Sequence, residues 1–202
     1  IALRRIHFMN FNYINYFSAN VIGVDTLSFI GLETLRRIDT LFITGSHALI
    51  KDCNSLNGIT SLQKLYLNTV FGNVDLDFMS NIIVMKELLL SSTKAKNLNG
   101  LRNIQFIERG LTVMENRLLL NCCGIKNLLA NGGVQGSIRI EMNGSDYFGL
   151  GPPLPQFECD NIDSIFTSNC DISTDSINLV ESKLYIDNNS NSIFDNNDIP
   201  IP

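Results

Sequence analysis

The stretch that decides the fold is FIGLETLRRIDTLFI at residues 29–43, because its apolar residues recur at fixed spacings. They stand at Phe29-x-Gly31-Leu32-x2-Leu35-x2-Ile38-x2-Leu41-x-Ile43. A similar spacing recurs in LNGITSLQKLYL, which is one step shorter, in LNGLRNIQFIERGLTV, which has three residues before its closing pair, and without the glycine in IIVMKELLL. The three further copies lie at residues 56–67, 98–113 and 82–90, with partial copies at 3–8 and 134–140.

Each copy closes with an apolar-x-apolar pair, and these pairs begin at residues 6, 41, 65, 88, 111 and 138. The gaps between them are 35, 24, 23, 23 and 27 residues. Both side chains of such a pair point to one face of a short strand, because side chains alternate along a strand. One unit cannot bury them alone, so stacked units are expected to share a core and a parallel sheet. The long first gap predicts an insertion between Asn10 and Asn20.

The residue between the two apolar residues of each pair faces away from the core. We expect these residues to form one exposed row along the sheet. Several of them are large and apolar, which favours a binding surface over a plain solvated face, although both interpretations remain open. The candidate ligand-binding residues are His7, Phe42, Tyr66, Leu89, Thr112 and Arg139.

The repeat resembles the receptor L-domain type of leucine-rich repeat, and its length fits the window of about 20–29 residues for such repeats. The segment from Asn121-Cys122-Cys123-Gly124 to Gly132-Gly133-Val134 resembles the closing repeat of leucine-rich surface proteins from Bacteroidota-type bacteria. The resemblance covers about residues 27–170. It implies a mainly β (β/α) solenoid, a right-handed stack of coils with one parallel sheet. It also implies export, display at the cell surface and no catalytic residues.

Four of the five cysteines gather toward the end of the repeats, and they predict a disulfide-stapled C-terminal cap. In the family, a paired cysteine opens a helix and two further cysteines follow, which here would be Cys159 and Cys170. Adjacent Cys122 and Cys123 cannot easily bond to each other. Two pairings therefore stay open, 122–159 with 123–170, or 122–170 with 123–159. Cys53 is expected at a buried ladder position of a coil.

Charge divides the chain near residue 145. Residues 1–144 carry 14 Lys and Arg against 10 Asp and Glu, whereas residues 145–202 carry one Lys against 10 acidic residues. The predicted domains are a solenoid at 1–145, a cysteine-containing cap at 146–175, and a linker with the start of another module at 176–202. The acidic tail argues against a nucleic-acid partner. No apolar run approaches the roughly 18 residues that a membrane span needs.

The tail predicts a calcium site. A twelve-residue calcium loop takes its ligands from positions 1, 3, 5, 7, 9 and 12, and position 7 uses its backbone carbonyl. Ser192 stands at position 6, where an EF-hand has glycine, and no flanking helices are evident, so this would be a loop site and not an EF-hand. The tail resembles the opening of the calcium-binding β-sandwich repeats of bacterial adhesins; an Asn- and Asp-rich flexible linker is the alternative. The candidate ligands are Asp187, Asn189, Asn191, Ile193, Asp195 and Asp198.

No catalytic or nucleotide-binding motif is present: the chain lacks G-x-S-x-G, H-E-x-x-H, a P-loop and G-x-G-x-x-G. The sequence therefore predicts a non-catalytic, secreted or cell-surface binding module. Its ligand would be a protein or a glycan, bound through the exposed sheet face. The alternative is a structural spacer within a long surface protein.

Overall fold

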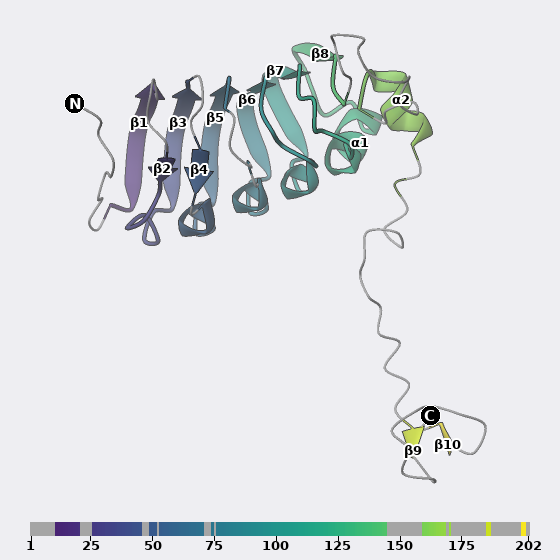
Figure 1. Ribbon diagram of the computed structural model, residues 1–202, viewed down its shortest axis with the longest axis horizontal. Coiled ribbons are helices and arrows are strands. Elements are labelled where there is room, and N and C mark those ends of the chain that lie inside the picture. Colours follow the sequence, from purple (N-terminus) through teal and green to yellow (C-terminus); the bar gives the residue numbers. More distant parts are fainter. Residues whose placement is uncertain are drawn as a thin grey trace. The chain divides into compact units, whose positions relative to one another are not determined.

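The structure is a computed structural model, and it describes residues 11–20, 26–45, 49–51, 53–70, 74, 76–144, 159–168, 170, 185–186 and 199–200. The chain divides into two compact units, residues 1–168 and residues 169–202. In the second unit, β9 (Tyr185–Ile186) and β10 (Ile199–Pro200) pair in antiparallel orientation. The first unit contains the candidate site, and its fold is mainly β (Figure 1).

One parallel sheet of six strands dominates the first unit, in the order β1-β3-β5-β6-β7-β8 (Figure 1). Every pair of neighbouring strands is parallel, so the chain returns to the same end of the sheet before each strand. The sequence expectation of a single main parallel sheet is confirmed. The strands are β1 (Tyr13–Asn20), β3 (Arg37–Thr44), β5 (Ser61–Asn68), β6 (Val84–Ser91), β7 (Phe106–Met114) and β8 (Ser137–Glu141).

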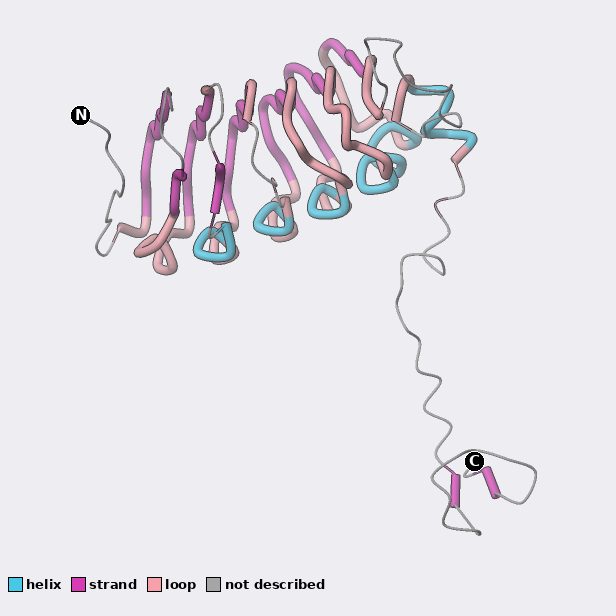
Figure 2. Tube along the Cα trace, in the orientation of Figure 1, coloured by secondary structure: helices cyan, strands magenta, loops and turns pink. Residues whose placement is uncertain are grey.

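Short helical segments and small strands form the connections between the sheet strands. β2 (Thr26–Ser28) and β4 (Leu49–Lys51) pair in parallel within the first two connections. The helical segments contact one another in sequence order, and Figure 2 shows them in a row below the strands. They are η1 (Cys53–Leu56), η2 (Asp77–Met79), η3 (Asn99–Leu101) and α1 (Cys123–Ala130).

The apolar positions of the repeat form the core between the sheet and these connections. Leu41, Leu65, Leu88 and Leu111, which open the closing pairs, are at most 1 % exposed. The fixed spacing therefore predicts the inward face of four successive strands correctly. Ile138, the corresponding residue of β8, is 39 % exposed, because β8 is the last strand in the order of the described sheet and has a strand on one side only.

The start of the sheet differs from the sequence expectation. Residues 13–20 form β1, whose Phe17 pairs with Leu41 of β3, so the expected insertion between Asn10 and Asn20 is wrong. Within the described residues the first closing pair is Phe17-x-Ala19, 24 residues before the pair that begins at Leu41, and the expected pair at residues 6–8 lies outside them. This copy is hard to recognise in the sequence, because Ala19 is small and gives a weak apolar signal.

One irregularity of the sheet has a direct cause in the sequence. The strand copies have two residues between Met85 and Leu88 but three between Ile107 and Leu111. The pairing of β6 with β7 shifts register at this place, between Met85 and Glu87. An extra residue in one strand of a pair produces a β-bulge, and here it leaves Gly110 opposite Glu87.

A disulfide between Cys122 and Cys159 joins the start of α1 to the segment before α2 (Ile162–Thr167), with 5.5 Å between the Cα atoms. The bond belongs to the first of the two predicted pairings, which places Cys123 with Cys170, and both of these cysteines are disulfide-bonded. The chain thus has two disulfides. α2 packs against α1, and its Ile165 is completely buried.

Cys53 does not occupy a buried ladder position. It opens η1 and is half-buried.

Candidate functional site

The sheet brings the predicted exposed residues into one row across five neighbouring strands. Phe42 pairs with Tyr66, Tyr66 with Leu89, Leu89 with Thr112, and Thr112 with Arg139. On β1 the position beside Phe42 belongs to Ser18. His7, predicted for that place, lies outside the described residues. We call this set the outer row: Ser18, Phe42, Tyr66, Leu89, Thr112 and Arg139.

Two aromatic rings of the outer row contact each other. The ring centroids of Phe42 and Tyr66 lie 5.8 Å apart, and their planes are tilted by 50°. Both residues are half-buried, because each is covered on one side by its neighbour. Tilted aromatic pairs at this distance are attractive, so each ring fixes the position of the other.

The phenol of Tyr66 is held by a carboxylate on the next strand. Its hydroxyl donates a 2.5 Å hydrogen bond to Oε2 of Glu87 on β6. Partial burial of the phenol, followed by the hydrogen bond and negative charge of Glu87, raises the pKa of Tyr66 to about 12. The phenol therefore stays protonated at physiological pH, and it leaves Oε1 of Glu87 unpartnered among the described residues.

A second polar network lies on the same face near β1, and we call it the Asp39 network. The Tyr13 hydroxyl donates to Oδ2 of Asp39 at 2.8 Å, whereas Arg37 Nε and Gln63 Nε2 both donate to Oδ1, at 2.8 and 3.1 Å. The guanidinium of Arg37 also lies 5.1 Å from the centre of the Tyr13 ring. Hydrogen bonds from Arg37 and Tyr13 lower the pKa of Asp39, and the bond to Asp39 raises the pKa of Tyr13.

Four aromatic side chains from three adjacent strands thus share this face, and we call them the aromatic surface: Tyr13, Tyr16, Phe42 and Tyr66. Tyr16 is the most open of them, at 60 % exposed. It pairs with Thr40 and is therefore a diagonal neighbour of Phe42. Sequence reasoning missed Tyr13 and Tyr16 because it did not recognise β1 as a strand.

The other end of the outer row is polar. Thr112 on β7 is half-buried, and Arg139 on β8 donates from Nε to Oε1 of Glu141 at 2.7 Å. On β7, Gly110 pairs with Glu87 of β6, and as a glycine it contributes no side chain to this face. The face therefore changes from aromatic to hydrogen-bonding along the sheet.

The predicted calcium ligands at residues 187–198 lie outside the described residues. Within the part of the chain that the structure describes, no group of three or more His, Cys, Asp or Glu side chains is placed to hold a metal ion. Among the same residues, no helix is long and apolar enough to cross a membrane.

Comparison with known proteins found no matching family model, no curated relative and no similar solved structure.

Proposed function

We propose that the chain is a leucine-rich-repeat solenoid. The proposal is supported by the recurrence of the closing pairs at gaps of 24, 24, 23, 23 and 27 residues once β1 is counted. Each unit contributes one strand to the parallel sheet and buries its apolar residues against the neighbouring units. This is the arrangement in which repeats stabilise one another although a single repeat would not fold.

We further propose that the solenoid is a non-catalytic binding module of the cell surface or the extracellular space, and that it binds a protein or glycan through the aromatic surface and the outer row. The observation that carries this proposal is the Phe42–Tyr66 pair, held in place by Glu87. Aromatic side chains that are already ordered lose little conformational entropy on binding, which is why such residues dominate binding energies. Two disulfides fit an oxidising compartment.

The test is a double variant, Phe42→Ser with Tyr66→Ser, probed on a glycan array and against a surface-displayed peptide library. Loss of two central aromatic residues typically costs more than about 2 kcal/mol, or roughly thirty-fold in affinity. A matched control is Leu120→Ser with Phe166→Ser, because both residues are exposed large apolar groups that lie outside the sheet. Circular dichroism verifies that each variant is folded.

We expect the control to bind like the parent chain and the sheet variant to lose the ligand. Equal binding by both folded variants would place the ligand elsewhere. Binding to no glycan and no peptide by the parent chain would favour a structural spacer in a longer surface protein.

A further inference from the structure

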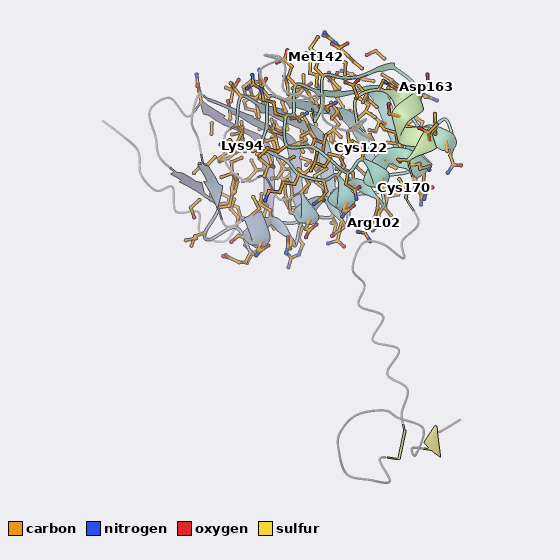
Figure 3. All side chains as sticks on the ribbon, turned by 45° about the vertical axis from the view of Figure 1, so that its right-hand side comes forward. Lys94, Arg102, Cys122, Met142, Asp163 and Cys170 are labelled. Carbon is orange, nitrogen blue, oxygen red and sulfur yellow. A yellow bond between two sulfur atoms is a disulfide. The ribbon has the colours of Figure 1, made fainter. Side chains whose placement is uncertain are left out.

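A groove lies on another side of the first unit, where the helical segments lead into the strands. The groove has a volume of about 760 Å³. It runs across three successive repeats, from the turn before β6, past the turn before β7, to α1. Arg102, which lines the groove, is labelled in Figure 3 among the helical segments.

Amide side chains dominate the polar lining, and two of them are fixed by hydrogen bonds to the preceding repeat. Asn81 Nδ2 donates to the backbone oxygen of Asn57 at 3.0 Å, and Asn103 Nδ2 donates to that of Ser80 at 2.7 Å. Both residues are exposed. Each amide oxygen is left without a partner among the described residues, so the groove presents oriented acceptors in adjacent units. The amides of the lining belong to Asn81, Asn103, Gln105, Asn127 and Asn131.

The charge of the groove also limits the kind of ligand that it could bind. Among the residues that the structure describes, Arg102 is the one charged residue of the lining, which includes no carboxylate. Arg102 Nε donates to the backbone oxygen of Asn99 at 3.1 Å, which anchors the guanidinium while its two terminal nitrogens remain available for a ligand. A guanidinium presents these donors in a planar fork that matches a carboxylate. Ile83, 53 % exposed, adds an apolar contact beside the amides.

The polar lining favours a polymer that is rich in hydroxyl groups. The oriented amide oxygens of Asn81 and Asn103 can accept hydrogen bonds, and the terminal nitrogens of Arg102 can donate them. A linear glycan presents hydroxyl groups on every sugar ring, and hydroxyl groups can both donate to and accept from amides.

We infer that this groove binds a linear glycan that carries carboxylate groups, with the sugar hydroxyls on the amides of Asn81 and Asn103 and a uronate carboxylate on Arg102. The site is separate from the aromatic surface, and it does not depend on the function proposed for that surface.

The test uses polygalacturonate as the acidic probe and dextran as the neutral one, in affinity electrophoresis of the whole chain. Residues 1–144, which include the groove, carry 14 Lys and Arg against 10 Asp and Glu, so a control variant at a cation outside the groove is needed to detect general attraction to an acidic polymer. We expect polygalacturonate to retain the chain and dextran not to. Arg102→Gln should weaken retention about ten-fold or more, because hydrogen bonds between charged groups are the strong ones. Asn103→Ala should weaken it several-fold.

Lys96→Gln is the matched control, because Lys96 is an exposed cation that does not line the groove. It should retain the parent affinity. The inference is overturned by absence of retention on polygalacturonate, by equal retention on dextran, or by equal weakening in the Lys96 and Arg102 variants. Circular dichroism confirms folding in each case.

Discussion

Asn116 is expected to be among the most sensitive polar residues of the chain. It follows β7 and is completely buried, as is Asn143 after β8. Its Oδ1 accepts from the backbone N–H and the hydroxyl of Thr93, at 2.9 and 2.6 Å. Its Nδ2 donates to the backbone oxygen of Leu90 at 3.1 Å and to Oδ1 of Asn143 at 3.0 Å. The side-chain amide of Asn116 therefore joins three successive repeats.

Replacement of Asn116 by alanine removes all four of these hydrogen bonds without admitting new partners. The N–H of Thr93 and the carbonyl of Leu90 lose their side-chain partner in the interior, and an unsatisfied buried group costs about 1–3 kcal/mol. The free energy of unfolding should fall by about 3–5 kcal/mol in total. Thr93→Val is the matched control, because it keeps the side-chain shape and removes one hydroxyl, which donates to Asn116 and accepts from the Ala95 N–H, at a cost of about 1–2 kcal/mol.

Urea denaturation followed by circular dichroism measures both variants, and the comparison requires an unchanged m-value. A loss for Asn116→Ala that is no larger than the loss for Thr93→Val would refute the reasoning. It would mean that the amide does not link the units in the way that its contacts imply.

Three further outcomes are expected. Cys122→Ser with Cys159→Ser opens a disulfide that spans a sequence separation of 37 residues, and it should lower the free energy of unfolding by about 4 kcal/mol, measured by urea denaturation; equal midpoints would contradict this. Asp39 should titrate below its ordinary pKa of 3.8, so its contribution to stability is present above that pH and is lost as the pH falls through the lowered pKa. Carboxyl NMR of Arg37→Gln should show the pKa of Asp39 rising, whereas an unchanged value would exclude Arg37 as the main cause. The segment at residues 187–198 should bind calcium in a chain extended beyond Pro202, and calorimetry should detect no heat after Asp187→Ala; equal heats would indicate a linker.

The sequence was sufficient for the periodic part of the fold. Leu65 and Leu67 are both buried whereas Tyr66 between them lies on the open face, as the two-residue period requires. The same rule, applied to two successive copies of the repeat, predicts that Phe42 and Tyr66 lie in one row. It failed at β1, because Ala19 is a weak apolar signal there and the exposed Tyr13 and Tyr16 obscure the alternation.

The polar contacts between units could not be predicted from the sequence. The residue after each of the strands β5, β6, β7 and β8 has a positive φ, yet it is Thr69, Ser92, Glu115 and Met142 in turn, so no residue type marks the position. The next position also differs in residue type between the repeats: it is Val70 after β5, Thr93 after β6 and Asn116 after β7. The Asp39 network joins residues of three strands, and its partners are known only once the register of those strands is known.

The contrast between Leu88 and Leu89 explains why the fold is easier to derive than the ligand. Leu88 is 1 % exposed and packs in the core, whereas its neighbour of the same type is half-buried in the outer row. Core packing restricts Leu88, since truncation of a buried leucine to alanine costs about 2–5 kcal/mol. Leu89 faces out of the core, so the outer row can change its chemistry while the sheet beneath it stays the same. The spacing therefore determines which side chains face outward, whereas the chemistry of those side chains is not set by the spacing.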